Sequence, residues 1–239
     1  MRCPWFADHQ RQVHMDFHMP EFPVRAIENF DATSFVDHLE RGRINMVALF
    51  AKGHFGNCFY DTEVGHKHSG LPGDFLREAA EECRDRGIRT LAYYSLCVDK
   101  RAWDENPAWR FEDAEGNRCG EDTFWAPLCM NGPYKDELVM PQLAEIAQYP
   151  VDGFWLDIPL PASDTGPCYC SHCRRKWQRE LGVELSDDLP LEMQSRLILR
   201  TVEDYLREVR AIIEEHNPKL VVATNAVGTP VMSLSVKNL

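Results

Sequence analysis

Residues 138–158, LVMPQLAEIAQYPVDGFWLDI, combine an amphipathic helix with a short apolar strand. Apolar residues recur at helical spacing from Leu138 to Ile146, as expected for a helix with one buried face. Residues 153–158 are then almost continuously apolar until Asp157, which suits a strand covered on both sides. A helix that leads directly into a buried strand is the repeating unit of a parallel α/β fold.

The same alternation extends along the rest of the chain. Further apolar segments predict strands at residues 12–18, 45–51, 89–96 and 220–224. Helical patterns separate them: a helix capped by Asp31, residues 75–86 ending at Gly87, and residues 191–215. Because the first strand is not followed by a glycine-rich turn, we expect a parallel (β/α) barrel of TIM type rather than a dinucleotide-binding sheet.

The chain length limits how much of a barrel can be present. The 239 residues supply about five or six strands, whereas a closed barrel of this type has eight strands in about 250 residues. We therefore expect residues 1–239 to form a single, incomplete (β/α) barrel domain, the N-terminal part of a longer catalytic domain.

Composition excludes some classes of function. The net charge of −12 argues against a nucleic-acid partner, because phosphate binding needs a basic surface. No run of 18 apolar residues is present to span a membrane, and the N-terminus lacks the apolar core of a signal peptide. With an odd count of nine cysteines, we expect reduced thiols or metal ligation, and hence a cytoplasmic location. The sequence does not determine the oligomeric state, and a homo-oligomer is one of the alternatives.

The densest group of cysteines lies at residues 168–173, CYCSHC. This C-x-C-x-x-C spacing can deliver three thiolates from one turn to a zinc ion, which needs a fourth, tetrahedral ligand. Cys129 is the first choice for that ligand, with Cys119 and His172 as weaker candidates. The alternative is a group of reduced surface cysteines, which would be prone to oxidation.

Two stretches carry a resemblance to a known zinc loop. CYCSHCRRKWQRELG at residues 168–182 resembles that of glycoside hydrolase family 42 β-galactosidases, and CMNGPYKDEL at residues 129–138 resembles the segment that supplies their fourth cysteine. The resemblance implies a structural zinc ion held by Cys129, Cys168, Cys170 and Cys173. That family has an Asn-Glu pair at strand four, where this chain has Trp155-Leu156-Asp157.

Asp157 is placed where barrel enzymes keep their chemistry, at the carboxyl end of a strand. Residues 134–157, the turn AKGHFG at 51–56 and the strand YYS at 93–95 are together similar to glycoside hydrolase family 29 α-L-fucosidases. That resemblance implies that Asp157 is a nucleophile. The combination also resembles an uncharacterised group of glycosidases that joins a family 29-like barrel to this cysteine loop. A structural role for Asp157 as a helix cap or loop anchor is the alternative.

Strand periodicity predicts a set of residues on one face. His14, Asp16 and His18 are each two residues apart and would point into the barrel, to bind sugar hydroxyls or to complete the core. The other expected substrate-binding residues are Lys52, His54, Tyr94 and Trp155. Aromatic residues of the loop that follows residues 89–96 could form a sugar platform or simply pack that loop.

The leading hypothesis is a retaining glycoside hydrolase with a carbohydrate substrate. Asp157 would attack the anomeric carbon, and a second carboxyl group would protonate the leaving oxygen. Asp164 is the first choice for this acid, with Glu63 and Asp99 as alternatives. In the families resembled, the acid can also lie later in the barrel, outside this chain. The rival hypotheses are a catalytically incomplete carbohydrate-binding domain with structural zinc, and a metal-dependent hydrolase that uses His14, Asp16 and His18.

Overall fold

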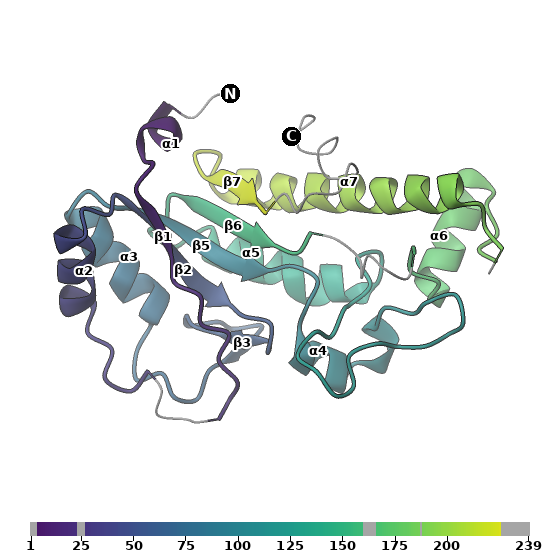
Figure 1. The fold of residues 1–239 in the computed structure, drawn as a ribbon, viewed down its shortest axis with the longest axis horizontal. Helices are drawn as coiled ribbons and strands as arrows, with labels where there is room; N and C mark the ends of the chain where they lie inside the picture. Colours follow the sequence, from purple (N-terminus) through teal and green to yellow (C-terminus); the bar gives the residue numbers. More distant parts are fainter. Residues whose placement is uncertain (1–3, 23–26, 160–165, 187, 226–239) are drawn as a thin grey trace.

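A seven-stranded sheet forms the centre of the computed structural model, which describes residues 4–22, 27–159, 166–186 and 188–225 (Figure 1). Five of its strands run parallel in the order β1-β2-β5-β6-β7. They are β1 (Gln12–His14), β2 (Met46–Lys52), β5 (Arg89–Ser95), β6 (Gly153–Asp157) and β7 (Val221–Thr224). All five apolar segments predicted from the sequence thus contribute a strand. The two-residue strands β3 (Asn57–Cys58) and β4 (His66–Lys67) extend the sheet beside β2.

The first strand is shorter than the predicted span of residues 12–18. β1 ends at His14, which lies opposite Ala48 of β2. Beyond that point the same edge of β2 is occupied by β3, which pairs with it at Lys52. Competition for the edge of β2 therefore ends the ladder of β1.

Helices follow the strands as the sequence patterns predict. They are α1 (Pro4–Asp8), α2 (Ala32–Arg41), α3 (Phe75–Asp85), α4 (Lys100–Glu105), η1 (Pro107–Trp109), η2 (Lys135–Val139), α5 (Met140–Ile146), α6 (Ser171–Leu181) and α7 (Leu191–His216). The Asp31 side chain accepts a hydrogen bond from the Ser34 N–H and so caps α2 as predicted. Pro141 lacks an N–H, and the chain enters α5 through the wider π-helical turn η2. None of the described helices is long and apolar enough to cross a membrane.

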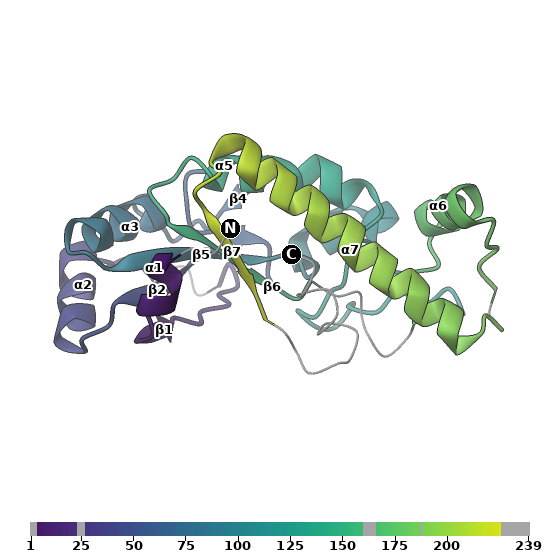
Figure 2. The ribbon, with the colours of Figure 1, turned by 90° about the horizontal axis from the view of Figure 1, so that it is seen from above.

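The sheet is open in the part of the chain that the structure describes. β1 pairs with β2 at one side and β7 pairs with β6 at the other, and no ladder joins β7 to β1 among these residues. Helices α3, α5 and α7 lie on the same face of the sheet (Figure 2). The architecture is mixed α/β with a mostly parallel sheet, as expected for part of a barrel, but a closed barrel is not observed.

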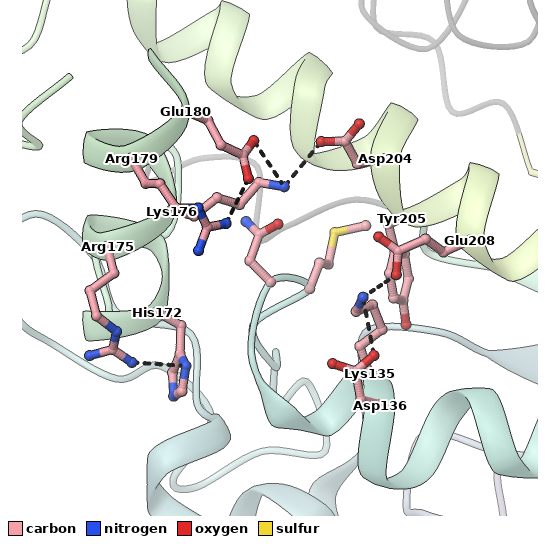
Figure 3. Close-up of a pocket in the computed structure, with 12 residues that line it drawn as sticks. Lys135, Asp136, His172, Arg175, Lys176, Arg179, Glu180, Asp204, Tyr205 and Glu208 are labelled. Atoms are coloured by element: carbon pink, nitrogen blue, oxygen red, sulfur yellow. Dashed lines mark hydrogen bonds and ion pairs between the residues drawn. The ribbon is translucent and has the colours of Figure 1, made fainter. Parts of the chain in front are cut away.

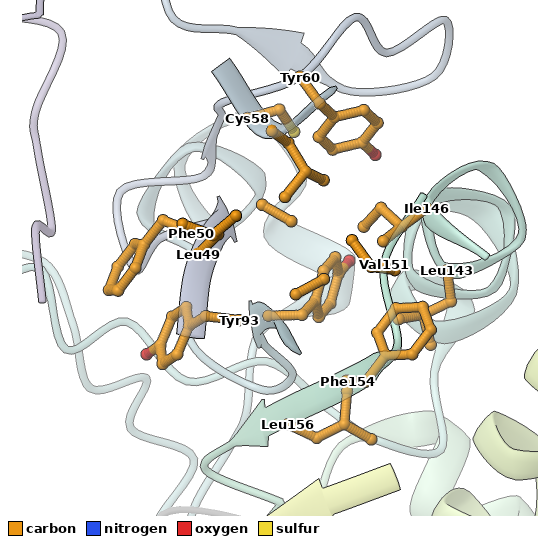
Figure 4. Close-up of a cluster of buried hydrophobic side chains, with 14 of the residues drawn as sticks. Leu49, Phe50, Cys58, Tyr60, Tyr93, Leu143, Ile146, Val151, Phe154 and Leu156 are labelled. Atoms are coloured by element: carbon orange, nitrogen blue, oxygen red, sulfur yellow. The ribbon is translucent and has the colours of Figure 1, made fainter. Parts of the chain in front are cut away.

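Alternation along the strands separates two kinds of environment. Leu49, Phe154 and Leu156 are fully buried on the side of α5, where they form the main core. Phe50 and Tyr93 extend to the opposite side, and their rings stack at 4.0 Å (Figure 4). We call this opposite side the inner face of the sheet. Burial of the apolar core at about 25 cal/mol per Å² supplies most of the stabilisation.

A second hydrophobic cluster surrounds the predicted zinc loop, apart from the main core. Its buried members are Phe111, Cys129, Cys168, Tyr169, Cys170, Cys173, Trp177, Leu185 and Leu197. Helix α7 joins both clusters, because Leu197 belongs to the second and the buried residues from Val202 to Ile213 belong to the main core. The loop between β6 and α7 thus has a small core of its own.

Gly153 is required for the close approach of β6 and β7. A Cβ atom there would lie 2.3 Å from the Val221 carbonyl oxygen and 2.4 Å from its Cγ2. We expect Gly153→Ala to lower the free energy of unfolding by about 1–3 kcal/mol, because overpacking forces the two strands apart. Gly42→Ala, whose Cβ would meet its nearest atoms at 3.4 Å, is the matched control in urea unfolding. Equal stability of the two variants would contradict this account of the β6–β7 contact.

Candidate active site and metal centre

Asp157 lies at the carboxyl end of β6 on the inner face of the sheet. The parallel register places it opposite Ser95 of β5. The Tyr93 hydroxyl donates a hydrogen bond to Asp157 Oδ2, and the Asn225 side-chain amide donates one to Oδ1. Asn225 directly follows β7, so residues of the strands on both sides hold the carboxylate between them.

His54 faces the same carboxylate from the turn that follows β2. Its side chain is 3% exposed, and Nε2 lies 3.6 Å from Asp157 Oδ2. Nδ1 lies 2.8 Å from Ser95 Oγ, which donates its own proton to the Val98 carbonyl oxygen. Ser95 must therefore accept from Nδ1, so the proton of a neutral ring is on Nδ1 and Nε2 carries a lone pair. That lone pair can accept a hydrogen bond from a hydroxyl group.

The neutral form of His54 is favoured by its surroundings. Burial, and then the positive charges of His18 and Lys52, lower the pKa of His54 from 6.5 to about 3. The Asp157 carboxylate lies 3.6 Å from Nε2 and makes no direct hydrogen bond to it. We therefore treat His54 as an uncharged acceptor at neutral pH.

His18 stacks on His54 and presents a donor to the inner face. The two rings lie 3.7 Å apart, and His18 Nδ1 accepts a hydrogen bond from the His54 backbone N–H. The proton of the neutral His18 ring is then on Nε2, which lies 3.4 Å from both Tyr93 Oη and Asp16 Oδ1. Burial is the main cause that lowers the pKa of His18. The site thus offers a donor and an acceptor side by side.

His18, His54 and Asp157 are close enough together to be considered as a metal site. One ligand atom from each lies within 4.8 Å of the others. However, a metal ligand must offer a lone pair, and the hydrogen bond to Nδ1 leaves the proton of His18 on Nε2. The Asp16 side chain, proposed as a ligand in the metal-dependent hypothesis, is 63% exposed. The donor set does not fit a catalytic metal ion.

The structure brings several predicted residues together around Asp157. Besides His18 and His54, the His14 ring lies 5.1 Å from Tyr93 and 6.0 Å from Trp155, on the inner face. Of the loop aromatics, Trp103 and Phe111 are buried, whereas Trp125 is half exposed and its ring lies 4.9 Å from His54. Phe124 of the same loop is half-buried, and its ring lies 6.0 Å from His54, so two loop aromatics stand beside the site and Trp125 is the more exposed.

Lys52 and Tyr94 lie away from this group. Lys52 is fully buried, its Nζ lies 4.6 Å from the Tyr94 ring centroid, and it donates to Asp99 and Tyr134 at 2.8 Å. The register of β2 shifts between Phe50 and Lys52, so this lysine does not stay on the face of Phe50. Lys52 and Tyr94 are thus part of the buried framework on the helix side of the sheet.

The alternative acids have other partners. Asp99 pairs with Lys52 and also caps α4 by accepting from the Ala102 N–H. Glu63 is exposed, and its backbone N–H donates to Glu145. Asp164 lies outside the described residues, so its position relative to Asp157 is not given by the structure.

Sequence reasoning missed Tyr93 and Asn225, which contact the Asp157 carboxylate directly. Asn225 could have been found, because it is the polar residue at the carboxyl end of the last apolar segment. Choosing Tyr93 over Tyr94 requires the register that places Tyr93 beside Trp155 and Ser95 beside Asp157. A strand of consecutive aromatic residues does not reveal which one faces inward.

The four cysteines predicted to bind zinc form a compact buried group. The Sγ atoms of Cys129, Cys168, Cys170 and Cys173 all lie within 4.8 Å of one another. Cys129 Sγ is 3.4 Å from Cys170 Sγ and 3.5 Å from Cys173 Sγ. A tetrahedron with metal–sulfur bonds of about 2.3 Å separates its sulfurs by about 3.8 Å. The four residues could therefore bind a metal ion.

Local structure favours the thiolate form of Cys170. Cys170 caps the N-terminus of α6, where the helix dipole favours negative charge. Hydrogen bonds from the other three thiols hold the pKa of Cys170 below its ordinary value. Asn131 Nδ2 lies 3.3 Å from Cys173 Sγ and 3.2 Å from Thr201 Oγ1 of α7. Cys119 is exposed and His172 is paired with Arg175, so the structure brings neither into the group.

A charged cavity of about 330 Å³ lies between η2, α6 and α7 (Figure 3). Lys176 pairs with Asp204 at 3.0 Å, and Lys135 pairs with Glu208. None of the inner-face residues around Asp157 lines this cavity. Because its lysines are already neutralised by acidic neighbours, we treat it as a surface ion-pair network rather than as a site.

Comparison with known proteins gives two kinds of match. The family model described as hypothetical glycosyl hydrolase 6 matches residues 31–158. Among solved structures, an α-L-fucosidase isoenzyme 2 from Paenibacillus thiaminolyticus is 30% identical with a TM-score of 0.79, over 90% of this chain and 32% of that protein. A hypothetical protein from Ruminiclostridium thermocellum shares the fold at 12% identity and a TM-score of 0.59, over 90% of this chain and 96% of that one. No curated protein matches significantly. The chain therefore spans about a third of the fucosidase that it resembles.

The depressed pKa of His54 predicts a pH dependence of stability. In the unfolded chain this histidine protonates near its ordinary pKa of 6.5, whereas the folded protein keeps it neutral to about 3. Unfolding therefore takes up a proton in this range, and the free energy of unfolding should fall by up to about 1.4 kcal/mol per pH unit below pH 6.5. Urea unfolding of wild type and His54→Asn between pH 7 and pH 5 measures the slope.

His54→Asn should lose most of the pH dependence of the free energy of unfolding. His38→Asn, at an exposed histidine, should keep it. Parallel slopes for wild type and His54→Asn would show that His54 is not held neutral by the fold.

Proposed function

Since the chain belongs to the family described as hypothetical glycosyl hydrolase 6, we propose that it acts on a carbohydrate and hydrolyses a glycosidic bond. The observation that carries this proposal is the inner-face carboxylate of Asp157, held by Tyr93 and facing His54 Nε2 at 3.6 Å. It stands at the strand end where barrel enzymes place catalytic groups. The neighbouring donor and acceptor histidines suit the hydroxyl groups of a sugar.

The reaction that we propose proceeds with retention of configuration. Asp157 attacks the anomeric carbon and forms a glycosyl ester while the bond to the leaving oxygen breaks, and Asp164 gives that oxygen a proton. A water molecule then loses a proton to Asp164 and attacks the same carbon, which releases Asp157. His18 supplies a donor and His54 an acceptor to ring hydroxyls, and Trp125 offers an apolar face.

The five parallel strands would form part of a longer barrel in this proposal. The support is the α-L-fucosidase from Paenibacillus thiaminolyticus, of which the chain matches 32% at 30% identity. Because that relative is a fucosidase, an α-L-fucoside is the first substrate to test.

We also propose a cytoplasmic location, because the free thiols of the described cysteines fit a reducing compartment.

The proposed nucleophile is tested by replacing its carboxylate. We expect Asp157→Asn to lower kcat on an aryl glycoside roughly 1000-fold, because no covalent intermediate can form. Azide should restore part of the activity of Asp157→Ala by attacking the anomeric carbon in place of the carboxylate. Asp104→Asn on the exposed face of α4 is the control and should keep wild-type activity.

Two results would count against this assignment. Full activity of Asp157→Asn would remove Asp157 from the chemistry. A wild-type protein that binds glycosides without cleaving any of them would favour the carbohydrate-binding hypothesis.

We further propose that the four-cysteine group holds one structural zinc ion. Four thiolates in a tetrahedron are the ligands of structural rather than catalytic zinc, because no position is left open for water. The separate hydrophobic cluster around them supports a local role in folding. Zinc at this centre would stabilise the loop that follows Asp157 without taking part in bond cleavage.

Metal analysis tests the zinc proposal. We expect about one equivalent of zinc in the purified protein and almost none in Cys170→Ser, together with a lower Tm, because metal binding and local folding are coupled. Cys119→Ser, at the exposed cysteine outside the group, should keep the metal. A second metal equivalent that survives in Cys170→Ser would instead support the metal-dependent hydrolase.

A further inference from the structure

Asn225 bridges Asp157 and the residue that follows it. Its side-chain Nδ2 donates to Asp157 Oδ1, and its side-chain Oδ1 accepts a hydrogen bond from the Ile158 backbone N–H at 3.2 Å. Both ends of one amide are therefore engaged at the carboxyl end of β6. A planar amide held at both ends fixes the position of its two partners relative to each other.

Ile158 has an unusual backbone conformation. Its φ angle is +51°, in the left-handed region that β-branched residues rarely adopt. The next residue is Pro159, and a residue before proline normally adopts an extended conformation. Such a conformation persists only where surrounding contacts hold it, and it often marks a functional site. The hydrogen bond that the Ile158 N–H donates to Asn225 Oδ1 is one contact that can hold it.

The carboxylate of Asp157 is restrained on both sides as a result. Asn225 occupies Oδ1, while Oδ2 accepts from Tyr93 and faces His54. A nucleophile reacts faster when its attacking oxygen is held in one orientation before the substrate arrives. Asn225 directly follows β7, the strand next to β6, so it approaches the carboxylate from the side of that neighbouring strand.

We propose that Asn225 is a positioning residue, which aims the Asp157 carboxylate through its bond to Oδ1 and keeps the left-handed turn at Ile158. This inference rests on the proposed glycosidase function with Asp157 as nucleophile. It assigns to the end of β7 a role other than sugar binding, because one N–H and the carbonyl oxygen of the Asn225 amide bond to protein groups.

Kinetics of Asn225→Ala test the catalytic part. We expect kcat to fall about 10- to 100-fold, the usual effect of losing a hydrogen bond to a charged group, with KM almost unchanged. The acidic limb of the pH profile should move to higher pH, because the ionised carboxylate loses a donor. Asn225→Asp, which puts a second carboxylate beside the first, should move this limb further in the same direction.

An Asn225→Ala variant with the kcat and pH profile of wild type would overturn the positioning role. A purely structural role would lower Tm and leave the pH profile in place, and that result would also overturn it. If the wild type cleaves no glycoside while Asn225→Ala lowers Tm less in an Ile158→Gly background, the proposed function fails and the structural link to Ile158 stands.

A thermal unfolding cycle tests the link to Ile158 without any substrate. Asn225→Ala should lower Tm by about 2–4 °C. In an Ile158→Gly background the loss should be smaller, because glycine adopts a positive φ without support. Arg43→Gly is the matched control, since Arg43 is the other described non-glycine residue with positive φ, at +53°. If Asn225→Ala lowers Tm by the same amount in the Ile158→Gly background as in the Arg43→Gly background, the link between Asn225 and Ile158 is overturned.

Discussion

The parallel register of β5, β6 and β7 determines most of what the inner face of the sheet can do. Because Ser95 lies opposite Asp157, the groups of β5 that point inward reach both His54 and the carboxylate. Leu156 lies opposite Thr224, the last residue of β7. Asn225, which follows it, therefore reaches the other oxygen of the Asp157 carboxylate. A slip of one residue in either pairing would turn these side chains toward the helices.

Hydrogen bonds to the protein framework explain how two similar histidines acquire opposite roles. His54 donates a hydrogen bond from Nδ1 to Ser95, and His18 Nδ1 accepts a hydrogen bond from the backbone N–H of His54. Each ring is thus fixed in one tautomer by a group that belongs to the framework rather than to the substrate. Burial keeps both rings uncharged near neutral pH, which is visible in their lowered pKa values. The result is a polar surface of fixed hydrogen-bond pattern beside a negatively charged carboxylate.

Much of this arrangement could be predicted from the sequence. The five apolar segments, the capping role of Asp31 and the position of Asp157 at a strand end follow from periodicity and from single residue types. Cys129 is matched to the C-x-C-x-x-C loop through a family resemblance, and the structure places these thiols together. What periodicity could not provide was the register shift in β2, which moves Lys52 to the helix side, and the choice of Tyr93 over Tyr94. Both depend on neighbouring strands that the local sequence does not identify.

Helix α7 has a mechanical consequence that follows from its 26 residues. At about 1.5 Å per residue it is about 39 Å long, and its buried residues divide between the cysteine cluster and the main core. The two cores are therefore connected by one continuous helix, and the stability of its N-terminal turns depends on the smaller, cysteine-containing core. Opening of that core would expose the first half of the helix to proteases while the half against the sheet stayed protected. Limited proteolysis and amide exchange should thus divide one regular helix into two segments of different stability.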